Sequence, residues 1–125
     1  MSELERVREV CLSLPEVTER LSHGSPTWFV RAKKTFVMYL DDHHGDGRLA
    51  IWCAAPPGMQ EALVSGEPDH YFRPPYVGHR GWIGVQLSEP ARPDWNEIAG
   101  AIEDAYAEIA PKSLVEQVAR ERGAA

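Results

Sequence analysis

Only two cysteines, Cys11 and Cys53, occur among the 125 residues, and they lack the CxxC spacing of zinc and redox sites. Both lie in apolar stretches, so we expect small core residues rather than nucleophiles or disulfide partners. No run of about 18 apolar residues is present, which excludes a transmembrane helix. The N-terminal stretch has no apolar block of the kind that secretory signals contain. The expected location is therefore the cytosol, away from any membrane.

Positive charge is also scarce, because 13 Lys and Arg stand against 19 Asp and Glu, giving a formal net charge of −6. This balance disfavours a protein that coats nucleic acid without sequence preference. The charge is unevenly spread, however, since residues 21–40 and 70–88 contain Lys and Arg but no acid. If these two segments meet in the fold, a local positive patch survives on an acidic protein.

Sequence motifs of catalysis are missing as well. No serine lies in a Gly-x-Ser-x-Gly turn, and the chain has no Gly-x-Gly-x-x-Gly, P-loop or His-Glu-x-x-His sequence. The 43% hydrophobic and 26% charged residues are typical of a soluble globular chain of one-domain size. We therefore expect a single domain over residues 1–125 that is not an enzyme and needs no cofactor.

Apolar spacing and turn residues divide the chain into helices and strands. Helices are predicted at Ser2–Ser13, Met59–Ser65, Asp94–Ala110 and Lys112–Arg122. Strands rich in β-branched and aromatic residues are predicted at Thr27–Arg31, Thr35–Leu40, Arg48–Ala54, His70–Arg73 and Trp82–Leu87. Because most strands are grouped and do not alternate with helices, the fold class is predicted as α+β with an antiparallel sheet.

Several local features refine this plan. The first three strands form a meander, after a loop at 23–26, and the first pair makes a tight hairpin with a basic tip. Asp94 caps the longest helix, with Glu97 in a capping-box position. The segment 74–81 is predicted to be an exposed loop. The large aromatic side chains on apolar faces are expected to be mostly buried; they are Trp52, Trp82, Trp95 and Tyr106.

Cations and aromatic side chains are interleaved in the two basic segments, which is typical of a surface that binds nucleic acid or another anion. The candidate residues are Arg31, Lys33, Lys34, Arg73, Tyr76, His79, Arg80 and Trp82. The hairpin tip (31–34) and the loop at 73–80 each adjoin a strand end, so they can lie at the same end of the sheet. The alternative is that the aromatics are half-buried sheet residues and that the cations only keep the hairpin soluble.

The turn Asp41–Gly47 combines carboxylates and imidazoles, which are ligands of divalent metals. Its order, DDHHGDG, does not match a calcium loop, and His43 and His44 would point apart on a strand. The five histidines also fit no zinc spacing. We expect a solvated turn and no metal, with a metal-handling role as a further alternative.

Three blocks of the chain resemble the MmcQ/YjbR family. They are CLSLPEVTE with GSPTWFV and KTF (11–36), YVGHRGWIGVQL (76–87) and IEDAY (102–106). The resemblance covers residues 4–118 and implies a CyaY-like fold, in which helices pack on one face of an antiparallel sheet. It also implies DNA binding through a double wing of strands and loops. The segment Gly78–Gly81 departs from the family pattern, with one cation fewer or moved.

Together these observations predict a small, monomeric, non-enzymatic binding module, with DNA as a weakly held partner by resemblance. The alternative is a protein-interaction or small-ligand-binding protein without affinity for nucleic acid. In that case Tyr76 and the two prolines before it would contact a protein or an apolar ligand.

Overall fold

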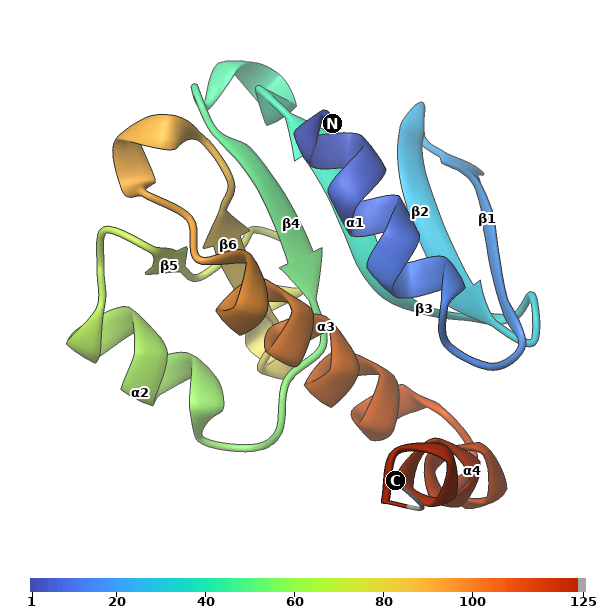
Figure 1. The fold of residues 1–125 in the computed structure, drawn as a ribbon. Helices are drawn as coiled ribbons and strands as arrows, with labels where there is room; N and C mark the ends of the chain where they lie inside the picture. The colour runs from blue at the N-terminus through green and yellow to red at the C-terminus, as the bar shows by residue number, and fades with distance from the viewer. Residues whose placement is uncertain (124–125) are drawn as a thin grey trace.

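A computed structural model describes residues 1–123, which fold into a six-stranded antiparallel sheet and four α-helices (Figure 1). The strand order across the sheet is β1-β2-β3-β4-β6-β5. The strands are β1 (Val17–Ser22), β2 (Ser25–Val30), β3 (Lys34–Asp41), β4 (Leu49–Cys53), β5 (Tyr71–Phe72) and β6 (Ile83–Gln86). The helices are α1 (Glu3–Leu12), α2 (Met59–Gly66), α3 (Trp95–Ile109) and α4 (Lys112–Gly123).

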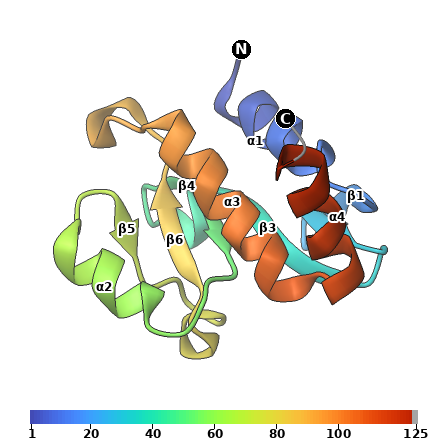
Figure 2. The same ribbon diagram turned by 60° about the horizontal axis from the view of Figure 1, so that its bottom comes forward.

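The two faces of the sheet are covered differently. Helices α1 and α3 lie across one face, while α2 packs beside β5 and α4 packs against α3 (Figures 1 and 2). Neighbouring residues of a strand point to opposite faces. Each strand therefore sends one set of side chains towards α1 and α3, on what we call the helix face. It sends the other set to the opposite side, which we call the open face.

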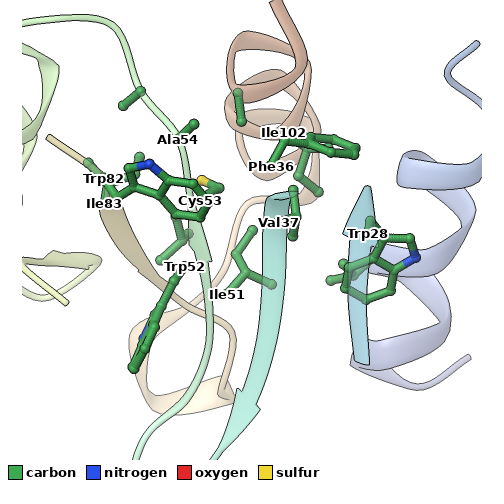
Figure 3. Packing of buried hydrophobic residues seen from close by; sticks show 14 of the residues in the cluster. Trp28, Phe36, Val37, Ile51, Trp52, Cys53, Ala54, Trp82, Ile83 and Ile102 are labelled. Atoms are coloured by element: carbon green, nitrogen blue, oxygen red, sulfur yellow. The ribbon is translucent and has the colours of Figure 1, made fainter. Parts of the chain in front are cut away.

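The core lies on the helix face. Trp28, Val37, Cys53 and Ile83 are cross-strand partners in one row over β2, β3, β4 and β6, and all are at most 2% exposed (Figure 3). A β-bulge opposite Trp28 and Phe29 leaves Phe36 without a cross-strand partner on β2. Burial of each large apolar side chain contributes about 1.5–3 kcal/mol, so this row is a main source of stability.

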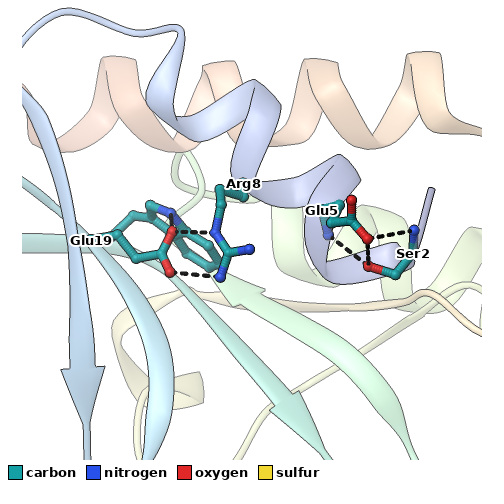
Figure 4. Close-up of polar contacts among 5 residues, drawn as sticks. Ser2, Glu5, Arg8 and Glu19 are labelled. Atoms are coloured by element: carbon teal, nitrogen blue, oxygen red, sulfur yellow. Dashed lines mark hydrogen bonds and ion pairs between the residues drawn. The ribbon is translucent and has the colours of Figure 1, made fainter.

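Polar groups on the helix face are paired. Glu19 on β1 accepts hydrogen bonds from Nε and a terminal nitrogen of Arg8 on α1 at 2.8 and 2.9 Å, and from Trp28 Nε1 at 3.0 Å (Figure 4). These bonds lower the pKa of the Glu19 carboxyl, chiefly through the hydrogen bond from Arg8. The Tyr106 hydroxyl donates to the Pro15 carbonyl at 2.8 Å. The network ties α1 and α3 to the start of the sheet.

The N-terminal caps of α1 and α3 are formed by the side chains that usually cap helices. Ser2 and Glu5 form a complete capping box at α1 (Figure 4), and the Asp94 side chain accepts from the amides of Asn96 and Glu97 at α3. The Glu97 side chain does not complete a capping box. It instead accepts a hydrogen bond from the Tyr71 hydroxyl on β5, so it joins α3 to the edge of the sheet.

The predicted fold class and the order of elements are confirmed, but strand β1 was not predicted. The meander therefore has four strands, and Ser25 and Pro26, expected in a loop, already belong to β2. Strand β1 is the edge strand next to β2 and is half-exposed, with a burial pattern that alternates only in part. Its sequence VTERLS lacks the apolar alternation by which a strand is recognised.

The expected core residues are found inside. Trp52, Trp82 and Tyr106 are 2–3% exposed, and Trp95 is partly buried with the Arg6 guanidinium 5.3 Å from its ring centre. Both cysteines are buried and free, and burial raises the pKa of the Cys53 thiol to about 12. None of the helices in residues 1–123 is long and apolar enough to cross a membrane.

Candidate functional site

A hollow of about 720 Å³ lies on the open face, over the middle of strands β2 to β4. Its floor comes from one cross-strand row, Thr27, Met38 and Trp52, with Leu40 beside it. The complete lining is Ser22, His23, Ser25, Thr27, Met38, Leu40, His43, His44, Trp52, Tyr76 and Val77. We call this hollow the open-face pocket.

Two turns and one loop form the walls of the open-face pocket. The β1–β2 turn supplies His23, and the 3-10 turn His43–Gly45 after β3 supplies two imidazoles. The third wall is the loop 74–81, which supplies Tyr76 and Val77. These walls come from three separate parts of the chain, so the pocket exists only in the folded protein.

The loop 74–81 is not the fully exposed loop that was predicted. Pro74, Val77 and Gly78 are buried against the sheet, and Tyr76 is the residue that projects, with 68% of its surface exposed. Gln60, a buried residue of α2, fixes the loop by donating to the carbonyls of Gly78 at 2.8 Å and Trp82 at 2.6 Å. These hydrogen bonds, together with the burial of Pro74 and Val77, hold the Tyr76 wall in place.

Aromatic and imidazole rings gather on one side of the open-face pocket. The His43 ring lies 4.8 Å from that of Trp52, 4.1 Å from that of His44 and 6.0 Å from that of Tyr76, measured between ring centres. All three pairs are arranged edge to face, the geometry that aromatic quadrupoles favour. His43 is therefore the centre of a four-ring cluster.

Two nitrogens of this cluster lack partners. His43 Nε2 and Trp52 Nε1 are buried and have no hydrogen-bond partner among the residues that the structure describes. Most buried side-chain donors in folded proteins are paired, and an unpaired one costs about 1–3 kcal/mol. Trp52 as a whole is only 3% exposed. Two polar atoms beneath the lining of the pocket are thus left without a partner by the described residues.

Left-handed backbone occurs around the pocket, as it does elsewhere at Glu16, Arg31, Ala32 and Arg92. His23, Asp42, His44 and Tyr76 all have positive φ angles, between 51° and 63°, although none is glycine. Each left-handed residue costs about 1–2 kcal/mol, and such strain often marks functional sites. The Asp42 carboxylate helps to hold its turn by accepting from the Gly47 amide at 2.7 Å.

The pocket is nearly free of formal charge. Among the residues that line it, histidine is the sole type that can carry charge near neutral pH, and no Lys, Arg, Asp or Glu is included. An uncharged and mostly apolar lining suits a ligand without a phosphate or other strong ionic group.

The predicted basic residues lie elsewhere and fall into two groups. Arg31, Lys33 and Lys34 form the β2–β3 tip, which borders the C-terminal end of α3, and Arg31 pairs with Glu16 at 3.1 Å. Arg73, His79 and Arg80 are exposed on the loop between β5 and β6. Tyr76 belongs to the open-face pocket, and Trp82 is 3% exposed beneath Arg80, so its ring is not available on the surface.

The two basic groups adjoin the same end of the sheet. The tip follows Val30 and precedes β3, and the loop precedes Ile83, which pairs with Cys53 at the end of β4. Strands β3 and β4 nevertheless separate them, and Figures 1 and 2 show the tip and the loop well apart. They share an end of the sheet without forming one continuous cluster.

Sequence reasoning missed most of the open-face pocket. His43 and His44 lie on a 3-10 turn within the predicted turn, but the contact between their rings was not expected. Residues 1–123 contain no group of three or more His, Cys, Asp or Glu side chains placed to hold a metal. The alternation of Met38, Leu40 and Trp52 on the side away from the helices could have indicated a second apolar face.

The fold and the open-face pocket define a small α+β domain with a ligand-sized hollow on the uncovered side of its sheet. A sequence profile of the YjbR family matches residues 12–108, and the chain therefore belongs to the YjbR family.

The fold is also similar to a solved structure, the Deinococcus radiodurans protein DR2400, described as a DUF419 domain. The TM-score is 0.74 at 16% sequence identity, covering 98% of this chain and 89% of that one. A similarity at this identity concerns the fold alone. A comparison with curated protein sequences finds no match.

Proposed function

We propose that this protein is a non-enzymatic binding module and that the open-face pocket is its ligand site. The observation that carries the proposal is the pocket itself, a hollow of about 720 Å³ built on three strands and walled by an anchored loop. Typical sites for small molecules and cofactors have volumes of roughly 300–1,000 Å³ and mostly apolar linings.

The hollow lies over apolar side chains of the sheet, including Met38 and Trp52, on the face that the helices leave open. Here the open space adjoins the unpaired ring nitrogens of Trp52 and His43 and the strained backbone at Tyr76. Space, unsatisfied hydrogen bonds and strain at one place together favour a binding role over a packing defect.

The experiment is a titration with naphthalene, an apolar ring system of suitable size, followed by ¹H–¹⁵N NMR. We expect the largest shift changes in residues 38–44 and 76–77, which line the open-face pocket. A blocking variant, Ser22→Trp, places a large side chain on the wall and should weaken binding at least about tenfold. The matched control, Thr18→Trp on the same strand but outside the pocket, should bind as the native protein does. Shifts spread over the helix face, or equal binding by both variants, would refute the proposal.

DNA binding is the second candidate, favoured by the placement of both basic groups at one end of the sheet. The overall charge of −6 limits it to a local contact with few phosphates. We expect weak binding of a duplex of about 20 base pairs at low salt, with a log–log salt slope of roughly −3 to −4.

Charge reversal separates this candidate from pocket binding. The triple variant Lys33→Glu, Lys34→Glu, Arg80→Glu should abolish the fluorescence anisotropy change of labelled duplex and leave naphthalene binding intact. A control triple that reverses Lys112, Arg92 and Arg120 to Glu changes the net charge equally but lies outside both basic groups. No anisotropy change at low salt for the native protein, or equal loss in both triples, would exclude a specific DNA site.

A further inference from the structure

A second hollow, of about 310 Å³, lies on the helix face between α2 and α3 (Figures 1 and 2). Its floor contains Ala54, Tyr71 and Ile83, which are all at most 4% exposed. Met59 and Leu63 form the wall on the side of α2, and α3 forms the opposite wall. We call this hollow the α2–α3 groove. It shares no lining residue with the open-face pocket, so it is a separate candidate site.

The wall on the side of α3 is a single stripe of the helix. Residues at positions i, i+3, i+4 and i+7 share one face of a helix. In α3 the residues at these positions all line the groove, and they are Glu97, Gly100, Ala101 and Asp104. The stripe therefore has a carboxylate at each end, and between them the groove is bounded only by backbone and one methyl group.

Gly100 is not required by the fold of the described chain. Glycine inside a helix is destabilising relative to alanine, and Gly100 lies well inside the 15-residue helix α3. Its φ angle is not positive, and a Cβ atom added there would meet nothing within 4 Å beyond the backbone of its own helix. At Gly84, by contrast, a Cβ atom would overlap the ring of Phe72. The missing side chain at Gly100 thus fits no neighbour and leaves the groove open.

The charge along the groove is negative only. No Lys, Arg or His lines it, and both of its acids, Glu97 and Asp104, are exposed. Within residues 1–123, Asp104 has no salt-bridge partner. Glu97 accepts a hydrogen bond from the Tyr71 hydroxyl through one of its two oxygens. Each carboxylate therefore retains acceptor positions for a cation.

The spacing of the two carboxylates sets the length of the ligand. Seven residues of α-helix rise about 10.5 Å, so Glu97 and Asp104 lie near opposite ends of the stripe. An extended chain of nine single bonds spans about 10–11 Å. The apolar floor between the two carboxylates suits a hydrocarbon chain. A lysine side chain of another protein has one charge and would pair with only one of them.

We propose that the α2–α3 groove binds a linear diamine. Its two ammonium groups pair with the carboxylates of Glu97 and Asp104, and its hydrocarbon chain lies over the floor in the space that Gly100 leaves open. This inference goes beyond the proposed function, because it concerns another face of the sheet and a cationic ligand.

The test is a ¹H–¹⁵N NMR titration at low salt with 1,8-diaminooctane, whose nitrogens are nine bonds apart. The largest shift changes should occur in residues 54–63 and 97–104. Octylamine lacks one ammonium group, and 1,4-diaminobutane is too short to reach both carboxylates. Since an exposed ion pair is worth up to about fivefold in affinity, each of these probes should bind about fivefold more weakly than 1,8-diaminooctane. Octane-1,8-diol, which has no charge, should bind most weakly.

Asp104→Asn removes one charge and keeps the shape of the side chain. It should weaken binding of 1,8-diaminooctane about fivefold and abolish the preference for this diamine over octylamine. The matched control, Glu108→Gln, removes one charge from an exposed position of α3 outside the groove and should keep the preference.

Gly100→Leu fills the groove and should weaken binding of the diamine at least about tenfold. Because leucine favours a helix more than glycine does, this variant should unfold at a higher urea concentration than the native protein, so unfolding would not explain the loss. The control Ala107→Leu, at an exposed position of α3 outside the groove, should bind as the native protein does.

Equal binding of 1,8-diaminooctane and octylamine, or an equal loss in Asp104→Asn and Glu108→Gln, would mean that amines gather on an acidic surface without a specific site, and would overturn the inference. Shift changes outside residues 54–63 and 97–104, or unchanged binding in Gly100→Leu, would also overturn it. Naphthalene binding tests the open-face pocket separately. It should be the same in Gly100→Leu and the native protein, and its absence from both would refute the proposed function alone.

Discussion

Two buried tryptophans on opposite faces of the same sheet differ in one respect. Trp28 on the helix face is fully buried, and its Nε1 donates to Glu19 at 3.0 Å. Trp52 on the open face is 3% exposed, and its Nε1 has no partner in the described structure. The two rings bury similar surface, so the difference lies in the hydrogen bonding around them.

The other groups on each face show the same contrast in hydrogen bonding and packing. On the helix face, polar groups are hydrogen-bonded to one another, such as Arg8 to Glu19 and Tyr106 to the Pro15 carbonyl. The open face has a hollow, strained turns and an exposed tyrosine above an anchored loop. The helix face is therefore the better satisfied of the two, and the open face is the side on which we propose that a ligand binds.

Replacing each tryptophan by phenylalanine tests this contrast most strongly. Trp28→Phe removes a donor to a charged acceptor, and such bonds are worth about 1.5–3 kcal/mol. Trp52→Phe removes a donor that has no partner and therefore loses no hydrogen bond. Urea unfolding should show Trp28→Phe to be the less stable variant by about that amount. Equal stability of the two variants would mean that the faces do not differ as described.

Glu19→Ala should lower the free energy of unfolding by about 1–3 kcal/mol, because it leaves Trp28 Nε1 buried without an acceptor and frees Arg8. The control is Glu16→Ala, which breaks the exposed pair with Arg31 and should cost less than about 1 kcal/mol. A loss in Glu19→Ala no larger than that of the control would show that the network contributes little.

Acid should weaken the helix face through the same carboxyl. The pKa of Glu19 lies below its ordinary value of 4.5 because Arg8 and Trp28 donate to the ionised form. Its contribution is therefore present above pH 4.5 and is lost as the pH falls through the lowered pKa. Between about pH 5 and pH 3, the stability of Glu19→Gln should fall less steeply than that of the native protein. Parallel curves would contradict this assignment.

Tyr76→Ala should have the smallest effect on stability and a clear effect on binding. The side chain is 68% exposed, so its removal should change the free energy of unfolding by less than about 0.5 kcal/mol. Naphthalene binding should weaken several-fold, because one wall of the pocket is lost. Leu12→Ala, which truncates an exposed side chain of α1, should affect neither quantity. Unchanged binding in Tyr76→Ala would remove this residue from the site.

The helix face was largely predictable from sequence because its residues repeat with regular periods. The spacing of Ile98, Ile102 and Ala105 identified the buried stripe of α3, and Asp94 marked its start. Strand β1 was not predicted because its pairing with β2, rather than apolar alternation, determines its structure.

The open-face pocket was not predictable in the same way. Its walls at His23, His43 and Tyr76 are brought together only by the topology of the sheet. Sequence selected Tyr76 as a binding candidate on a cationic surface, whereas the structure places it in the wall of the pocket, away from the cations. Gln60 was overlooked because a polar residue on a short helix gives no sign that it anchors a loop 18 and 22 residues away.

The most direct test of the account is to locate a bound probe through the methionine methyl groups. The chain has three methionines: Met38 in the pocket floor, Met59 on α2 and Met1 at the terminus. With ¹³C-methyl methionine, the account predicts nuclear Overhauser contacts from naphthalene to Met38 and none to the other two. Contacts to Met59 in place of Met38 would put the ligand beside α2, and would contradict the claim that the open face is the binding face.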